Sequence, residues 1–499
     1  MALTMEKKIV EAEQVIGSAY GQIPLRAESE PTGLREAAEI LWEDARLYLA
    51  PARAADSGAE VEGTIYCQAL YRLSGDSALR TAVCEMPIRE MLEIEGAQSG
   101  MTAVCEGDIE HLEARYSGGR VVFTGAAGLR ARISAPAETE IVASASGDGL
   151  ECRTQTCVSR KLTAENAAMA TLRDEVSLPA ALRARGVLIT RSTVKNIRCE
   201  PEPGGVRVGG EILTEALIRC GVEERPVAMV KYTLPFEQAL SFPDSAAGEA
   251  VGAVAVRTLD CRLDDEDSED AALKILCEVR ISAGLYAVEE TAVISDAYGT
   301  GSADYTPQTI PLRLCAGTRT LEGREDFRGE LLLPEGAQGV GAVLAVRAVP
   351  RVSETEGDIV RGVVESMCLY VPAGREQVSC VRGETPFEMK FSDAIPANSN
   401  VRMEALDADA LSVVSDRMEI RCTLWGRCIS TQEETLQAVS HLIETPAAKP
   451  PAALVIHYAA GKEELWDIAR RYRVRLAEVK KLNPQMQRPQ PGEPILVFV

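Results

Sequence analysis

Residue types that commonly carry out catalysis are sparse in this chain. Its three histidines are His111, His441 and His457, which we place in a loop-like stretch, at the approach to a connector and in a strand. The sequence has no Gly-rich phosphate loop ending in Lys-Ser/Thr and no Gly-x-Ser-x-Gly elbow, so phosphoryl and acyl transfer have no sequence basis. We therefore expect a protein that is not an enzyme and that holds no cofactor.

Possible metal ligands are also poorly spaced. The pairs Cys152/Cys157 and Cys422/Cys428 lack the two-residue spacing of zinc knuckles, and neither has a second pair nearby. The acidic run 264–270 lacks the glycine and terminal glutamate of an EF-hand loop. We expect the 14 cysteines to be reduced thiols, many of them in strands, and the acidic run to be a solvated hairpin loop.

The charge balance restricts the partners. Lysine and arginine number 53 and aspartate and glutamate 75, so the formal net charge is −22. Such a chain repels nucleic-acid phosphates and anionic membrane surfaces, and no apolar run approaches the roughly 18 residues of a membrane-spanning helix. The charged start, Met1 to Glu13, does not resemble a secretory signal. We expect a cytoplasmic protein whose partners are proteins or neutral glycans.

The elements that would position any site come from an internal repeat. Two markers recur three times in the same order: a Gly-led segment and, 24 or 25 residues after its glycine, a proline that precedes Ile or Phe. The Gly-led segments are 63–71, 210–218 and 362–370, and the prolines are Pro87, Pro235 and Pro386. Markers in this order and at these offsets indicate three copies of one domain.

The repeated Gly-led segment has the pattern of a β-strand. Every second residue after the glycine is small or apolar, which places one face of a strand against a core. Proline has no amide hydrogen, so the second marker should lie on an edge strand or at the start of a strand. We expect a mainly β fold in which each copy is a sandwich or a partly open barrel, two alternatives that the sequence does not separate.

The composition changes near the C-terminus. Residues 441–453 are rich in Pro and Ala, which favours an extended connector. Beyond it the patterns predict a strand at 454–458, a helix at 464–472, a second helix that stops at Asn483-Pro484, and a strand at 495–499. We expect a small βααβ domain at 454–499.

This C-terminal segment resembles the LysM family through Leu-Trp-x-Ile-Ala-x-x-Tyr at 465–472, Val474, Leu482-Asn-Pro and Pro491-Gly492. LysM modules usually bind N-acetylglucosamine polymers with the loop before the first helix and the loop after the second. The resemblance places these loops at Gly461, Lys462, Glu463 and Glu464 and at Asn483, Pro484 and Gln485. The first loop departs from the family's Gly-Asp-Thr-Leu by an extra residue and two acids. Trp466 could line a groove or belong to the core.

Three copies carrying a Gly-led strand and a Pro-Phe-Glu marker look like SPOCS domains. Together with the LysM-like segment they resemble the SipL-type spore coat morphogenetic family, and the expected division is 8–150, 165–300 and 320–440 for SPOCS-like domains, 441–453 for the linker and 454–499 for the LysM-like domain. The resemblance implies a mother-cell cytoplasmic protein at the forespore surface that binds spore coat scaffold proteins, including the coat morphogenetic ATPase. The alternative is binding of peptidoglycan in the spore cortex or cell wall.

Overall fold

The computed structural model consists almost entirely of β-strands, and two short α-helices lie near the C-terminus. It describes residues 2–31, 38–223, 225–242, 248–265, 271–335, 339–396, 399–414, 416–448, 453–486 and 488–499. The strands before residue 447 form three successive groups, which we name unit 1 (4–146), unit 2 (150–299) and unit 3 (303–446). The mainly β class expected from the sequence is confirmed.

The three units contain equivalent strands. Unit 1 consists of β1 (Thr4–Ser29), β2 (Ala38–Leu49), β3 (Arg53–Ala55), β4 (Gly58–Leu73), β5 (Leu79–Glu93), β6 (Thr102–Ser117) and β7 (Arg120–Ser146). Unit 2 consists of β8 (Leu150–Ser177), a 3-10 turn (Ala180–Leu182), β9 (Ala184–Glu202), β10 (Gly205–Val222), β11 (Arg225–Ser241), β12 (Glu249–Leu263) and β13 (Ala272–Gly299). Unit 3 consists of β14 (Ala303–Leu332), β15 (Val340–Glu356), β16 (Ile359–Pro372), β17 (Ser379–Lys390), β18 (Val401–Val414) and β19 (Arg417–Pro446).

Each unit is a sandwich of two antiparallel sheets with one topology. The first sheet has the orders β1-β7-β6, β8-β13-β12 and β14-β19-β18, and the second is β2-β4-β5 with the short β3 on β4, β11-β10-β9, and β15-β16-β17. The edges of the two sheets also meet, because β2 contacts β6 and β1 contacts β5, as do their counterparts in the other units. Each unit therefore has features of both alternatives expected from the sequence: it is a sandwich whose two sheets also meet at their edges, as in a partly open barrel.

The two repeated sequence markers lie side by side in every unit. Gly63 pairs with Ile88, Gly210 with Phe236 and Gly362 with Phe387, so the glycine always stands opposite the residue that follows the marker proline. The prolines themselves lie on β5, β11 and β17, which are edge strands of their sheets. The prediction that these prolines occupy sheet edges is confirmed.

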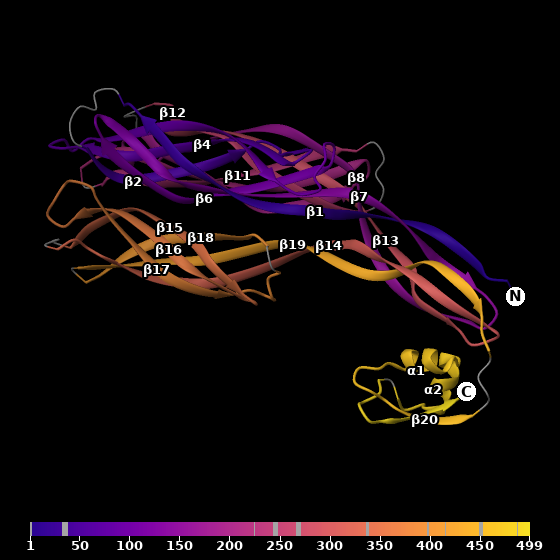
Figure 1. The fold of residues 1–499 in the computed structure, drawn as a ribbon. Coiled ribbons are helices and arrows are strands. Elements are labelled where there is room, and N and C mark those ends of the chain that lie inside the picture. Colours follow the sequence, from indigo (N-terminus) through magenta and orange to yellow (C-terminus); the bar gives the residue numbers. More distant parts are fainter. Residues whose placement is uncertain are drawn as a thin grey trace.

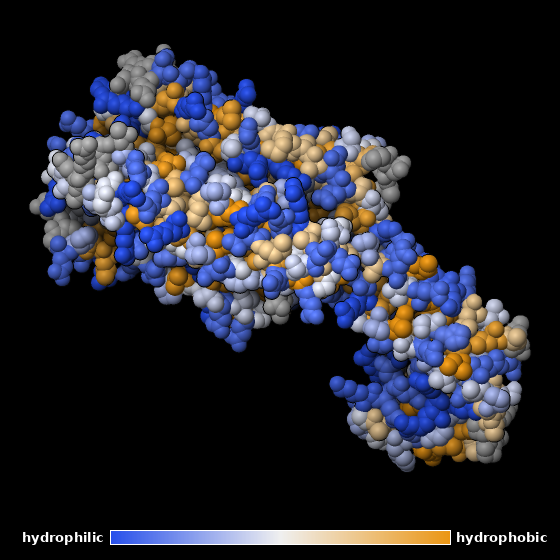
Figure 2. All heavy atoms as spheres, turned by 45° about the horizontal axis from the view of Figure 1, so that its top comes forward, coloured by the Kyte–Doolittle hydropathy of each residue, from blue (hydrophilic) through white to orange (hydrophobic). Residues whose placement is uncertain are grey.

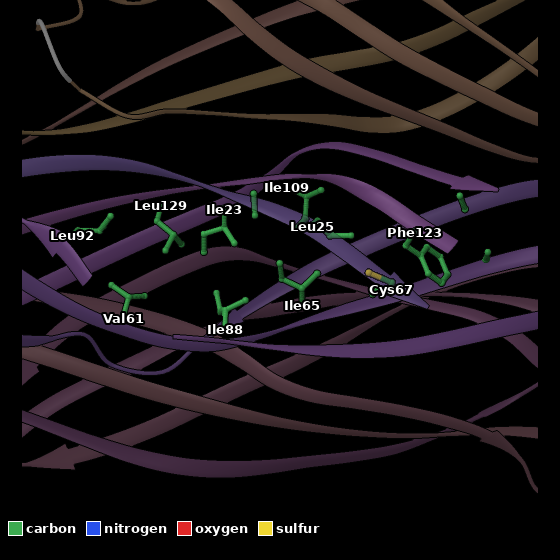
Figure 3. Close-up of a cluster of buried hydrophobic side chains, with 14 of the residues drawn as sticks. Ile23, Leu25, Val61, Ile65, Cys67, Ile88, Leu92, Ile109, Phe123 and Leu129 are labelled. Carbon is green, nitrogen blue, oxygen red and sulfur yellow. The ribbon is translucent and has the colours of Figure 1, made fainter. Parts of the chain in front are cut away.

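The alternate residues after each glycine are buried in the core of their unit. In unit 1, Ile65 and Cys67 have no exposed surface, and they pack with residues from both sheets, as Figure 3 shows. The equivalent positions in the other units include Thr214, 1% exposed, and Ser366, 4% exposed. The period-two pattern in the sequence therefore identifies the inner face of this strand correctly.

The second sheets of the three units also pack against one another in a cyclic order. The strand that carries the marker proline in one unit contacts the first strand of the second sheet in the next unit: β5 contacts β9, β11 contacts β15, and β17 contacts β2. Leu70, Leu217 and Leu369, each seven residues after its marker glycine, are fully buried in one shared cluster. The three units, which together we call the body, therefore pack around one another with approximate three-fold order within one chain.

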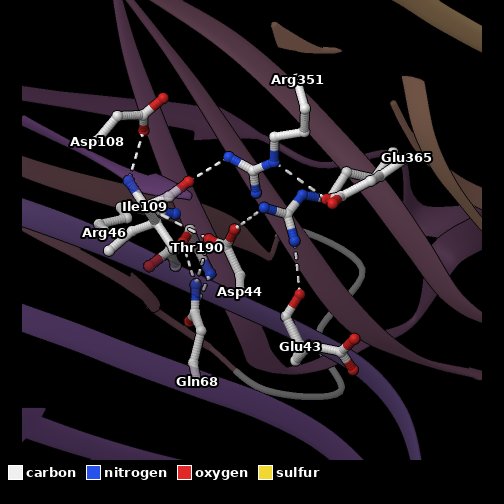
Figure 4. A network of polar contacts seen from close by, with 10 residues as sticks. Glu43, Asp44, Arg46, Gln68, Asp108, Ile109, Thr190, Arg351 and Glu365 are labelled. Atoms are coloured by element: carbon white, nitrogen blue, oxygen red, sulfur yellow. Dashed lines mark hydrogen bonds and ion pairs between the residues drawn. The ribbon is translucent and has the colours of Figure 1, made fainter. Parts of the chain in front are cut away.

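A buried polar cluster lies beside this leucine cluster. Asp44, Arg191 and Arg347 occupy equivalent positions, since each pairs with the residue five places after its marker glycine. Arg347 forms an ion pair of 2.7 Å with Asp44, and its guanidinium also donates to the carbonyl oxygen of Glu43 at 2.6 Å. Figure 4 shows these contacts together with the bond of 2.7 Å from Gln68 to the carbonyl oxygen of Thr190. The cluster thus links all three units.

The first and last strands of each unit extend beyond the sandwiches as long ribbons (Figure 1). Val10, Ile141, Val293, Leu312 and Ala438 from the three ribbons share a buried cluster. β19 continues to Pro446 because it pairs with β14 as far as Ala303. The first six residues of the range where we expected a connector, His441 included, are therefore strand, and His111, expected in a loop, lies in β6.

The C-terminal module, residues 454–499, has the expected order of strand, helix, helix and strand. It consists of β20 (Leu454–Tyr458), α1 (Leu465–Tyr472), α2 (Leu476–Leu482) and β21 (Pro494–Phe498), with β20 and β21 antiparallel. Its helices lie between the ribbon ends and its own sheet (Figure 1). The described residues include no helix long and apolar enough to cross a bilayer. Most of the acidic run expected as a loop, 266–270, lies outside the described residues.

Candidate functional site

The C-terminal module is fixed to the end of the unit 2 ribbon through helix α1. The indole Nε1 of Trp466 donates to Oδ2 of Asp296 at 2.8 Å, and the guanidinium of Arg470 contacts the same oxygen at 2.8 Å. The rings of Trp466 and Tyr298 meet edge to face with centroids 4.9 Å apart. Because Trp466 is 6% exposed and Tyr298 2%, both rings belong to one core that spans the module and β13.

Tyr298 and Arg473 make further bonds between the turn that joins α1 to α2 and the region around the ribbon end. The Tyr298 hydroxyl donates to the carbonyl oxygen of Val474 at 2.9 Å, and burial raises the pKa of this phenol. Arg473 has a left-handed backbone with φ of 54°, and its guanidinium reaches four backbone carbonyl oxygens. These belong to Gly299, Gly301, Ala303 and Ala448, at 3.0 to 3.2 Å. A guanidinium that binds several carbonyl groups fixes the orientation of the module.

Within the first LysM-like loop, Glu463 is committed to internal contacts. Its carboxylate accepts from the backbone NH of Ala460 at 2.9 Å, lies 3.0 Å from Nε2 of His457 and pairs with Arg471 at 2.5 Å. The bonds from Ala460 and His457 hold the pKa of Glu463 below its usual value. This carboxylate therefore organises the loop and is not free to meet a ligand.

Glu464 is also engaged. Its carboxylate pairs with Arg153 of β8 at 2.7 Å, and its backbone NH donates to the side chain of Asp467 at 2.8 Å, which caps the start of α1. Gly461 and Lys462 form an exposed turn, and Gly461 has φ of +61°. Of this loop, Gly461 and Lys462 remain accessible.

The second LysM-like loop leads from α2 into β21. Asn483 ends the helix, where its amide donates to the carbonyl oxygens of Val479 and Leu496 at 2.8 Å and accepts from the NH of Leu496 at 2.9 Å. Pro484 and Gln485 follow in an exposed turn. The two loops therefore contact different residues: the first contacts His457, Arg471 and Arg153, and the second contacts Val479 and Leu496. Among the described residues, no hydrogen bond or ion pair joins the two loops.

Several residues that fix the module were not identified from the sequence as site residues. Asp296, Tyr298, Arg153 and Arg473 were not among the candidate site residues. Their bonds between the module and the ribbon end join residues that are more than 100 positions apart in the sequence. Such long-range contacts leave no periodic pattern in the local sequence, so they could not be predicted from it. The regular spacing of Leu465, Ile468, Ala469 and Tyr472 indicated a helical face, but not the surface that this face would meet.

The thiols show no sign of a metal or redox site. All 14 cysteines are free. Burial raises the pKa of Cys152 and of Cys422 to about 11, and it raises the pKa of Cys157 and of Cys428 as well. Among the residues that the structure describes, no three His, Cys, Asp or Glu side chains gather as ligands of a metal ion would.

A family model matches part of unit 1. Neither the search of curated proteins nor that of solved structures found a similar chain. Residues 36–117, which contain β2 to β6 of unit 1, match the family described as SipL, SPOCS domain. The matched segment includes the first Gly-led marker and its proline, Pro87. Through this segment the chain is similar to proteins that carry a SipL-type SPOCS domain.

Proposed function

We propose that this protein is a non-enzymatic adaptor of spore coat assembly, and that its C-terminal module docks a coat scaffold protein. The match of residues 36–117 to the SipL SPOCS family is the observation that carries the sporulation role. The partners that we propose are coat scaffold proteins, including the coat morphogenetic ATPase, and the proposed location is the mother-cell side of the forespore surface. We propose that the domains are three SPOCS-like units at 4–146, 150–299 and 303–446, within which the long first and last strands pair, and the C-terminal module at 454–499.

The contacts of the C-terminal module favour protein docking over glycan binding. In the first LysM-like loop, Glu463 is bonded to His457 and Arg471, and Glu464 is paired with Arg153. Trp466 is covered by Tyr298, so its ring is not available for stacking on a sugar. The module is instead held in one orientation at the end of the body, as suits the presentation of a fixed surface to a large partner.

The proposal is tested in sporulating cells with a fluorescent fusion of the chain and a variant that lacks residues 454–499. We expect the full chain to gather at the forespore and the truncated chain to remain dispersed. Circular dichroism of the purified truncated chain, with its β signal retained, shows that the units still fold. Normal localisation of the truncated chain would refute the docking role. Retention of the isolated full chain on purified peptidoglycan, with loss on truncation, would favour the glycan alternative.

A further inference from the structure

The sheet of the C-terminal module exposes an apolar face. Five of the ten residues in β20 and β21 are large hydrophobic side chains in contact with solvent. They are Leu454 (65% exposed), Ile456 (54%), Tyr458 (64%), Leu496 (37%) and Phe498 (56%), and we name them the outer sheet face. Contiguous apolar surface of this kind marks interaction sites in soluble proteins.

The strand register makes this face continuous. Leu454 pairs with Phe498, and Ile456 pairs with Leu496, so their side chains stand on the same side of the two-stranded sheet. The alternate residues Ile495 and Val497 point to the other side and are fully buried under the helices. The two-stranded sheet therefore has apolar side chains on both sides. Its inner side forms the core of the module, and its outer sheet face is exposed to solvent.

The attachment of the module leaves the outer sheet face free. Trp466, Arg470 and Arg473 hold the helical side against the ribbon end. In Figure 1 the sheet lies on the side of the module away from the ribbons. In the view of Figure 2 apolar surface lies along the lower rim of the module, beside strongly hydrophilic surface. The module is thus held by one side and presents the other.

The C-terminal module as a whole carries a net positive charge. Residues 454–499 contain eight lysines and arginines against five aspartates and glutamates, a net charge of +3 in a chain of −22. Most of the acids have partners, as Glu463 and Glu464 do. Five exposed cations of the module, by contrast, have no ion pair within the described part of the chain: Lys462, Arg475, Lys480, Lys481 and Arg488.

Two of these cations, Lys480 and Lys481, lie in the last turn of α2, and the end of this helix is tied to β21. Asn483 bonds to the backbone of Leu496 in both directions, at 2.8 and 2.9 Å, and so ties the end of α2 to the middle of β21. Lys481 and Leu482 directly precede Asn483, and Leu482 is 39% exposed. The positively charged end of α2 is therefore held at the middle of β21, the strand that carries Leu496 and Phe498.

We propose that the outer sheet face, with Lys480 and Lys481 at the end of α2, docks an acidic protein surface that presents apolar side chains among carboxylates. The apolar contacts supply the affinity, and Lys480 and Lys481 select a partner of opposite charge. This inference rests on the proposed function, since it names the surface that the scaffold protein would meet. It assigns docking to the sheet and not to the two LysM-like loops.

The test uses the full chain and, as probe, the purified coat morphogenetic ATPase from the same organism, with binding followed by biolayer interferometry. The variants are Ile456→Glu/Phe498→Glu on the sheet and Lys480→Glu/Lys481→Glu at the end of α2. Met169→Glu, which changes a 59% exposed residue of β8, is the matched control. Lys462→Ala/Gln485→Ala changes the accessible loop residues. Tryptophan fluorescence checks that every variant keeps the module folded on the ribbon.

We expect both charge-introducing variants of the module to weaken binding by about tenfold or more. The control and the loop variant should bind like the unaltered chain, and added salt should weaken binding because the cations contribute. Unaltered binding by the sheet variant, or weakening by the loop variant alone, would overturn this inference and leave the proposed function standing. A failure of the unaltered chain to bind the ATPase would instead contradict the proposed function. Loss of peptidoglycan retention or of self-association in the sheet variant, without loss of ATPase binding, would assign the face to another occupant.

Discussion

Trp466 in helix α1 donates its indole NH to Asp296 at the end of β13, across 2.8 Å and 170 residues of sequence. The same carboxylate meets Arg470, so it neutralises a cation while it accepts from the indole. The bond joins the C-terminal module to the body through buried groups and not only through the connecting chain. A module held in this way presents the same surface to every partner.

Replacing Asp296 with alanine should release the module. The variant leaves the Trp466 NH without an acceptor and Arg470 without its ion pair, a loss of about 1–3 kcal/mol of docking free energy. In a background where Trp42 and Trp425 are phenylalanine, we expect the emission of Trp466 to shift to longer wavelength as its ring becomes solvated. An unchanged spectrum in Asp296→Ala would show that the indole bond does not hold the module.

The buried pair of Asp44 and Arg347 should be needed for the units to pack together. Asp44→Ala leaves Arg347 buried without its carboxylate, and breaking a buried pair in this way costs about 3–5 kcal/mol. Urea unfolding followed by circular dichroism measures the change. Asp44→Ala/Arg347→Met removes both charges of the pair and should recover part of the loss, because no unpaired arginine is left at position 347. Equal stability of Asp44→Ala and the unaltered chain would contradict a role for this cluster.

The same carboxylate makes the stability depend on pH. Burial alone would raise the pKa of Asp44, but the guanidinium groups of Arg347, Arg46 and Arg191 outweigh it and hold the pKa below its usual value. A lowered pKa adds stability above the unfolded value of about 4, and this stability is lost as the pH falls through the folded value. We expect Asp44→Asn to lose less unfolding free energy between pH 7 and pH 3 than the unaltered chain does. A parallel loss in both proteins would contradict this assignment.

Gly210 should not tolerate a side chain. A Cβ at this position would lie 2.7 Å from Cζ of Phe236, the ring that covers the glycine across the β10–β11 pair. We expect Gly210→Ala to lower the free energy of unfolding by about 1–3 kcal/mol through overpacking. The matched control is Gly209→Ala, because a Cβ at Gly209 would meet nothing closer than 3.6 Å. The nearby Gly204 is unsuitable as a control because its φ is positive. Equal effects of the two substitutions would argue against the packing explanation.

Thr214 offers a stabilising change. Its hydroxyl is buried and has no hydrogen-bond partner among the described residues, while the equivalent position in unit 1 is Cys67, which lacks a hydroxyl. Thr214→Val keeps the shape and removes the unsatisfied hydroxyl, so we expect a gain of about 1 kcal/mol in unfolding free energy. Thr190→Val, at a half-buried site, serves as the comparison. Destabilisation by Thr214→Val would show that the hydroxyl is satisfied in solution.

The sequence revealed the parts of this molecule better than their assembly. Gly210 and Phe236 could be recognised as repeated positions from their spacing, but their pairing across β10 and β11 appears only in the structure. The helix around Trp466 followed from its apolar spacing. The packing of Leu70 with Leu217 and Leu369 could not be predicted, since a buried leucine on the second face of a strand reads like any other core residue. The length of β19 was also missed, because its pairing with β14 overrides a Pro- and Ala-rich composition.

The most direct test of the adaptor account is co-purification from sporulating cells that carry the tagged full chain or the chain without residues 454–499. The account predicts that coat scaffold proteins elute with the full chain and are lost with the truncated one, although both chains fold. Recovery of the same scaffold proteins with the truncated chain would contradict the assignment of docking to the C-terminal module.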